Sequence, residues 1–124
     1  MAMSKGQIEA EISRAIVEFE KEYMGRGPDE TRTYFLGDMV VVRLHRVLTL
    51  AEKHLAKADE SAKGRALVKQ VRTELLEKAR PLLDKTVSNI TGRKVISLHT
   101  DISTVTGERI IVFTLGESPS VGSR

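Results

Sequence analysis

The sequence predicts an α+β fold in which one four-stranded antiparallel sheet carries its helices on a single face. Apolar residues recur every three or four positions over 8–23 and again over 67–90, which is typical of amphipathic helices. Two pairs of apolar runs, over 33–44 and 96–115, flank short turns and indicate antiparallel hairpins. The order is helix, hairpin, helix, helix, hairpin, so the two hairpins can join into one sheet beneath the helices.

The first helix begins after Ser4, which can cap it, and stops at Gly25-Arg26-Gly27-Pro28, where one of the glycines can adopt the left-handed conformation of a C-cap. Pro28 prevents the helix from continuing. The glutamates that lie off the apolar stripe are expected to face solvent; they are Glu9, Glu11, Glu18, Glu20 and Glu22.

The first hairpin turns at Gly37-Asp38, because glycine in the first position suits a two-residue type II′ turn. That turn pairs Leu36 with Met39 and Tyr34 with Val41. One face of the hairpin is then uniformly apolar, consisting of Phe35, Val40, Val42 and Leu44. The opposite face is mixed, consisting of Arg32, Tyr34, Leu36, Met39, Val41 and Arg43.

Two helices are expected in the middle of the chain. Thr49 and Glu52 form a capping box for a short helix that runs to about Lys57. A polar break over 59–61 precedes a long helix over 62–90, in which Pro81 predicts a kink. Its apolar residues near one side are Leu67, Val68, Val71, Leu75, Ala79, Leu82, Leu83 and Ile90.

The second hairpin has a four-residue loop over 104–107 if Ser103 pairs with Glu108. Its apolar face is then Ile96, Leu98, Ile111, Phe113 and Leu115. Its other face is Ser97, His99, Asp101, Ile110, Val112 and Thr114. We expect one domain over 1–115, with a flexible start over 1–4 and a disordered tail over 116–124.

Composition narrows the class of protein. The 124 residues include no cysteine, so disulfides and thiolate metal sites are excluded, and the cytoplasm is the expected location. The three histidines show no metal-ligand spacing, and no apolar run is long enough for a membrane span. We expect no metal and no cofactor. The balance of 20 Lys+Arg against 17 Asp+Glu does not favour nucleic acid. On the long helix Lys69 and Arg72 could meet phosphates, but a solvated helix face is the ordinary explanation.

The mixed face of the sheet predicts a partner. A sheet covered on one side should expose polar residues on the other, yet this face keeps apolar side chains. We expect them to form a homodimer interface; they are Tyr34, Leu36, Met39, Val41, Ile110 and Val112. The alternative is that the helix over 50–57 or the tail lies across this face.

Two places could carry chemistry or bind a ligand. His99 and Asp101 lie two apart on a strand, so their side chains share a face, and an Asp beside a His raises the histidine pKa. Ser97 and Arg43 could join them in a small anion site or a general-base site. The second place is the loop Gly25-Arg26-Gly27, whose amides and arginine could hold an anion, although a plain helix stop explains it as well.

Five segments of the chain match the motifs of one known family: FEKEYMGRGP over 19–28, LTxAEK over 48–53, ARPL over 79–82, SLHTDIST over 97–104 and TGER over 106–109. On these segments the chain resembles the MpsC-like family, formerly a domain of unknown function, over most of its length from Ser4 to Leu115. It implies an association with a sodium-translocating, membrane-potential-generating system linked to inorganic-carbon uptake. It implies no established activity and no assigned catalytic residues.

The sequence therefore predicts a dimeric cytoplasmic accessory or regulatory protein that binds a protein partner at a membrane transport system or a small anionic ligand. A small enzyme with His99 as acid or base and Asp101 orienting it, acting on an anionic substrate held by Arg26 or Arg43, stays open as the alternative. A nucleic-acid binder that uses the long helix is the second alternative.

Overall fold

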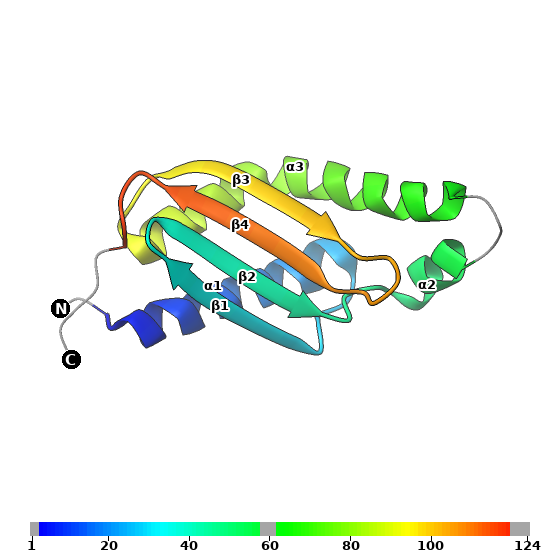
Figure 1. Ribbon diagram of the computed structural model, residues 1–124, viewed down its shortest axis with the longest axis horizontal. Coiled ribbons are helices and arrows are strands. Elements are labelled where there is room, and N and C mark those ends of the chain that lie inside the picture. Colours follow the sequence, from blue (N-terminus) through cyan, green and yellow to red (C-terminus); the bar gives the residue numbers. More distant parts are fainter. Residues whose placement is uncertain (1–2, 58–61, 120–124) are drawn as a thin grey trace.

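The computed structural model describes residues 3–57 and 62–119 and has the predicted α+β fold (Figure 1). Its elements in chain order are α1 (Lys5–Phe19), the π-helix η1 (Glu20–Met24), β1 (Glu30–Leu36), β2 (Met39–His45), α2 (Leu50–Lys57), α3 (Lys63–Thr91), β3 (Val95–Ile102) and β4 (Arg109–Leu115). The predicted polar break over 59–61 and the ends of the chain, 1–2 and 120–124, lie outside the described residues.

The four strands form one antiparallel sheet in the order β1-β2-β4-β3. Each hairpin has the predicted register, with Leu36 opposite Met39 and the amide of Ser103 donating to the carbonyl of Glu108. The central pair is β2 with β4, in which Val41 lies opposite Val112. The two hairpins are therefore joined through their second strands.

Helices α1 and α3 lie behind the sheet, and the core fills the space between the two layers (Figure 1). The inward strand residues are the predicted apolar ones at Val40, Val42, Ile111 and Phe113, all fully buried. Ile96 was expected in this set and is 58% exposed. The register shifts between Val95 and Ser97, and a bulge of this kind leaves its extra residue unpaired.

The stripe of α3 that faces the core differs from the predicted one. The buried residues of α3 are Gly64, Val68, Arg72, Leu76, Ala79, Leu83, Val87 and Thr91. Leu67, Val71 and Leu82 were predicted on this side and are exposed instead. The helix continues through Pro81.

The short helix α2 packs against the first turns of α3 at the end of the sheet, next to the loop between β3 and β4 (Figure 1). Its capping box is present, since the Glu52 amide donates to the Thr49 hydroxyl at 3.1 Å and the Thr49 amide donates to Glu52 Oε1 at 2.8 Å. The helix does not cross the outer face of the sheet, which rules out one of the two alternative covers. In the tail, the Ser118 carbonyl accepts a hydrogen bond from Arg93.

Gly64 is required by the close approach of α2 to α3. A Cβ atom at this position would lie 2.0 Å from the carbonyl oxygen of Leu55. Gly64→Ala should therefore force the two helices apart and lower the free energy of unfolding by about 1–3 kcal/mol, the usual cost of overpacking.

The matched control is Gly6→Ala in α1, where a Cβ would meet nothing within 4 Å. That variant should gain up to about 1 kcal/mol from helix propensity. Urea unfolding followed by circular dichroism measures both. Equal effects at the two positions would contradict the close approach.

Candidate functional site

Three charged side chains are buried where the helices meet the end of the sheet. Glu20 is 0% exposed, Arg72 is 1% and Arg109 is 2%. Glu20 was expected to face solvent and Arg72 was expected on a solvated helix face, so both expectations were wrong. The three residues come from η1, α3 and β4, so they join segments far apart in the sequence.

Glu20 bridges the two arginines. Its Oε1 accepts from Arg72 Nη1 at 3.1 Å, and its Oε2 accepts from Arg109 Nη1 at 3.1 Å. Arg109 also donates from Nε to the Thr100 hydroxyl at 3.2 Å. A single carboxylate therefore binds one guanidinium with each of its oxygens.

Arg72 extends the chain of contacts to α2. Its Nε and Nη2 bind the two carboxylate oxygens of Glu52 at 2.8 and 2.7 Å, which is the bidentate geometry of a strong arginine–carboxylate pair. Its Nη2 also donates to the Val47 carbonyl at 2.9 Å. We call the chain Glu52–Arg72–Glu20–Arg109 the buried network. It contains two positive and two negative charges, so it is neutral overall.

The surroundings of these groups keep the network charged. Burial alone raises the pKa of Glu52, but hydrogen bonds from Arg72 and from the Thr49 amide outweigh it and hold that pKa below its ordinary value. Burial lowers the pKa of Arg72, and the bonds to Glu52 together with the charge of Glu20 outweigh that effect and raise it. Burial lowers the pKa of Arg109, yet arginine stays protonated in proteins.

The periodicity of the sequence places all three buried charges at positions that face the core. Glu20 follows Ile8, Ile12 and Ile16 at intervals of four, all on the buried side of α1. Arg72 stands midway between the buried Val68 and Leu76. Arg109 alternates with Ile111, Phe113 and Leu115 on the inward face of β4. A charge at a position where the pattern requires an apolar residue was the signal that sequence reasoning missed.

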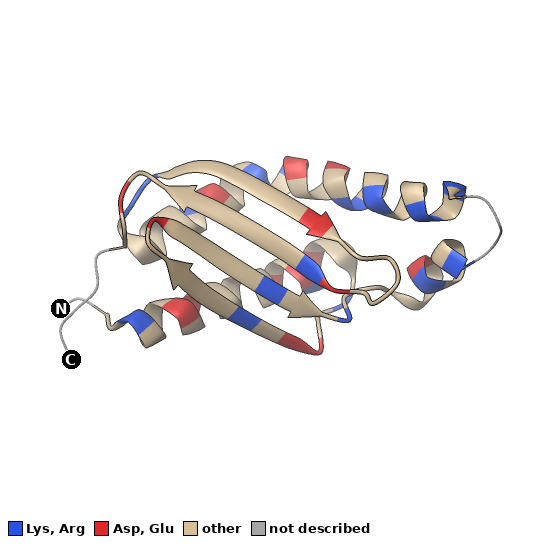
Figure 2. Cartoon of the chain, in the orientation of Figure 1, with Lys and Arg blue, Asp and Glu red and all other residues tan. Residues whose placement is uncertain are grey.

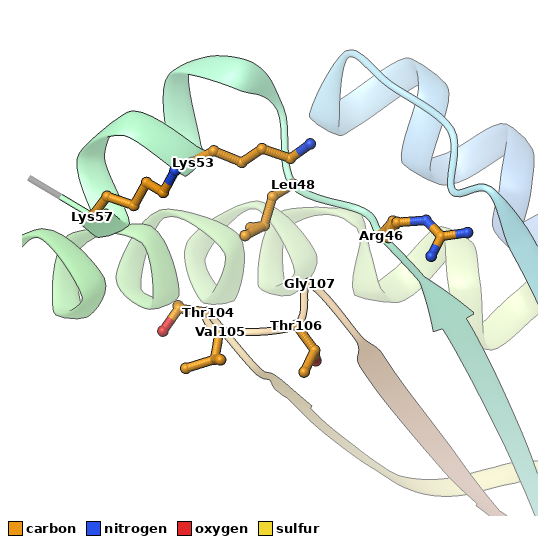
Figure 3. A pocket seen from close by; sticks show the side chains of 8 residues that line it. All are labelled: Arg46, Leu48, Lys53, Lys57, Thr104, Val105, Thr106 and Gly107. Atoms are coloured by element: carbon orange, nitrogen blue, oxygen red, sulfur yellow. The ribbon is translucent and has the colours of Figure 1, made fainter.

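A cleft of about 260 Å³ lies between α2 and the β3–β4 loop (Figure 3). Its lining includes Lys53, which follows Glu52 in the chain, and Gly107, two residues before Arg109. Leu48 lies between its two walls. No carboxylate is among the eight described residues that line it, which are Arg46, Leu48, Lys53, Lys57, Thr104, Val105, Thr106 and Gly107. Sequence reasoning did not select the lysines or the threonines of this set.

The backbone at the base of the cleft is closely packed. The Val47 amide donates to the Gly107 carbonyl at 2.9 Å. Gly107 has φ 79° and Arg46 has φ 54°, both in the left-handed region. A Cβ at position 107 would lie 3.3 Å from the Arg46 Cα, so glycine allows the loop and the end of β2 to meet.

The loop Gly25-Arg26-Gly27 supports this cleft from outside. Arg26 Nη1 donates to the carbonyls of Arg46 and Leu48. Arg26 also pairs with Asp29 at 3.0 Å, and Arg46 pairs with the same carboxylate at 2.5 Å, which turns its guanidinium away from the cleft (Figure 3). The hydrogen bond from Arg46 is the largest cause that lowers the pKa of Asp29. A left-handed cap was predicted at one of the glycines of this loop, and Gly25, with φ 84°, is that cap.

The other predicted site residues lie on the outer face of the sheet, where His99 and Asp101 line an open hollow of about 200 Å³ together with Thr100, Ile110 and Val112. His99 and Asp101 share a face of β3, but no hydrogen bond or ion pair in the described residues joins them. Asp101 accepts from the Ile102 amide, the largest cause that lowers its pKa, and pairs with Lys69 at 3.3 Å. Arg43 pairs with Glu108 at 2.5 Å. Ser97 lies opposite Thr114 on the same face, one row from His99.

The residues predicted as an interface are all on this outer face, opposite the helices. Leu36 is 58% exposed and Tyr34 is 44% exposed, and the rest of the set is partly exposed: Met39, Val41, Ile110 and Val112. Figure 2 shows charged residues at one end of the strands and uncharged residues toward the other. No described segment of the chain covers this face (Figure 1).

The described ranges 3–57 and 62–119 contain neither a metal-binding cluster nor a membrane-spanning helix. Within them, no three His, Cys, Asp or Glu side chains gather in a group that could hold a metal ion. Their helices also include none with the length and apolar character that crossing a membrane requires.

The fold and these contacts define an α+β protein built on one open sheet, with a buried ionic network beside a cationic cleft. The chain matches, over residues 4–117, the family model described as "Na+-translocating membrane potential-generating system (MpsC)", and it belongs to this MpsC family.

Two relatives from Bacillus subtilis (strain 168) match as well. The uncharacterized protein YbcI is 45% identical over 115 residues, which cover 93% of this chain and 90% of the relative. The uncharacterized protein YrhF is 29% identical over 107 residues, which cover 83% of each. No solved structure matches the chain.

Glu20→Gln should destabilise the protein strongly, because among the described residues Glu20 supplies the one carboxylate that Arg109 contacts, and its loss leaves a buried charge without compensation. Breaking a buried ion pair from one side costs about 3–5 kcal/mol. The control is Glu11→Gln, since the Glu11 side chain is 43% exposed and, among the described residues, its one ion pair is with Arg14 on the surface of α1. The control should change stability by less than about 0.5 kcal/mol. Urea unfolding compares the two, and equal losses would contradict the role of Glu20.

Proposed function

We propose that this protein is a non-catalytic accessory protein that binds a small anion in the cleft between α2 and the β3–β4 loop. The observation that carries the proposal is the composition of the cleft, which has two lysines, two threonine hydroxyls and no carboxylate among its described lining residues. Lys53 and Lys57 lie on successive turns of α2, above the loop (Figure 3). No ion pair within the described residues engages either of them.

The size of the cleft indicates the class of ligand. About 260 Å³ is below the range of roughly 300–1,000 Å³ that holds drug-sized molecules. An oxyanion of a few atoms, such as phosphate, bicarbonate or a short carboxylate, fits that volume. Lysine ammonium groups bind such anions as mobile point charges, and the hydroxyls of Thr104 and Thr106 can donate to the same oxygens.

The family description supports the setting of this proposal. It names a sodium-translocating, membrane-potential-generating system, and the resemblance implies a link to inorganic-carbon uptake. We place the protein in the cytoplasm as a partner of such a system, bound to a membrane protein rather than inserted itself. Bicarbonate is the anion that this setting favours.

We also propose that the protein acts as a homodimer through its outer sheet face. The support is the set of exposed apolar side chains on that face, led by Leu36 and Tyr34. Leaving large apolar side chains in water forgoes up to about 1.5–3 kcal/mol each relative to full burial. A second copy of the same face would remove them from water.

The anion site is tested by titrating ¹⁵N-labelled protein with inorganic phosphate and, separately, with bicarbonate at constant ionic strength. Amide shifts should saturate and be confined to residues 48–57 and 104–107. Lys53→Ala combined with Lys57→Ala should weaken binding at least about tenfold, because two charge-assisted contacts are lost.

The matched control combines Lys78→Ala with Lys85→Ala, two exposed lysines of α3 outside the cleft. Their loss removes the same net charge and should leave binding unchanged. Shifts spread over all basic surfaces, or an equal loss in both double variants, would show general charge screening and contradict the site.

A further inference from the structure

We propose that two copies of the chain dock through their outer sheet faces about a two-fold axis that runs parallel to the strands. In this arrangement β1 of each copy covers β3 of the other, and β2 covers β4. The inference rests on the proposed dimer and specifies its geometry. Antiparallel sheets that stack face to face keep their strands aligned to within about 30°, which this axis allows.

The strand pairings turn the outer face into three rows of four residues, each read from β1 across to β3. The first row is Arg32, Arg43, Ile110 and Asp101. The second row is Tyr34, Val41, Val112 and His99. The third row is Leu36, Met39, Thr114 and Ser97. Among these three rows charge is confined to the first, and beyond it Glu30 continues the outer face of β1 opposite His45.

Charge within the first row is unevenly placed. Both arginines are on the β1–β2 side, and the aspartate is on the β3 edge. A two-fold axis parallel to the strands places each row over the same row of the second copy, and it places the β1 edge of one copy over the β3 edge of the other. Arg32 then faces Asp101 of the second copy, and this contact occurs twice. In the central row Tyr34 faces His99 and Val41 faces Val112.

The contacts that Arg32 and Asp101 make within one chain leave both side chains available to a second copy. Arg32 is 65% exposed and bonds Glu30 at 2.9 Å, and Asp101 is 79% exposed and meets Lys69. Exposed pairs of this kind contribute only about 0–1 kcal/mol. Turning the side chains toward a second copy therefore costs little.

The alternative two-fold axis runs across the strands and is disfavoured by the same map. It exchanges the first and third rows, so Arg32 would lie over Leu36 and Arg43 over Met39 of the second copy. Covering a charge with apolar side chains carries a desolvation cost, and the two arginines would keep only the counter-charges of their own chain, Glu30 and Glu108. The axis along the strands gives Arg32 the further counter-charge of Asp101 and places only Arg43 over an apolar residue, Ile110.

The small area of the outer sheet face predicts a dimer that forms reversibly. Four strands spaced about 4.8 Å apart and seven residues long project roughly 450 Å² per copy, which is below the about 800 Å² per partner of a standard interface. Association should depend on concentration, so the electrostatic contacts should affect it measurably.

Charge reversal tests the register. Arg32→Asp and Asp101→Arg each create two like-charge contacts in a homodimer, so each variant alone should dimerise at least about tenfold more weakly than the unmodified chain. An equimolar mixture of the two variants should restore dimerisation, because in the mixed dimer both contacts again join opposite charges. Sedimentation equilibrium at low ionic strength measures the three dissociation constants.

The matched control is Arg14→Asp on α1, since Arg14 is also 65% exposed and pairs with a nearby glutamate. It should leave dimerisation unchanged. A dimeric chain whose two variants are not rescued on mixing would overturn this docking and leave the homodimer standing. A chain that stays monomeric at all concentrations would overturn both, while the anion titration would still decide the cleft.

Discussion

The chain of contacts Glu52–Arg72–Glu20–Arg109 is the interaction on which the rest of the structure depends. It joins α2, α3, η1 and β4, four elements that are distant in the sequence. A buried ionic network rarely adds net stability compared with well-packed apolar residues, because desolvating the charges offsets most of their attraction. The network instead provides geometric specificity, because each carboxylate oxygen and each guanidinium nitrogen must meet its partner. We infer that the network specifies how these elements sit, while the apolar core supplies the stability.

The network also explains why a cleft exists beside it. Glu52 holds α2, which carries Lys53 and Lys57, and Arg109 holds the start of β4, two residues after Gly107. The two walls of the cleft are thus anchored to the two ends of one network. Arg26 lies outside the cleft and holds the backbone at its base by donating to two backbone carbonyls. The arginine that sequence reasoning selected as an anion ligand therefore holds the backbone, and the lysines that it passed over line the cavity.

Much of the fold was predictable because local patterns determine it. The Gly37-Asp38 turn set the first register, and the pairing of Ser103 with Glu108 set the second. The core stripe of α3 was partly wrong because Leu67 and Leu82 match a helical period as well as Val68 and Leu83 do, and only the packing of α1 and the sheet decides between them. Glu20 and Arg72 were assigned to solvent by residue type, although their spacing indicated the interior. The cleft was not predictable, because α2 and the β3–β4 loop come together only through tertiary contacts.

The most direct test of this account is a double-mutant cycle between the two ends of the network. Glu52→Gln, Arg109→Met and the combined variant are unfolded in urea, and the three losses in free energy are compared. Glu52 and Arg109 share no hydrogen bond among the described residues, so independent sites should give losses that add to within about 0.3–0.5 kcal/mol. The account predicts a combined loss that is smaller than the sum by more than about 0.5 kcal/mol, because the network acts as one unit. Additive losses would contradict it.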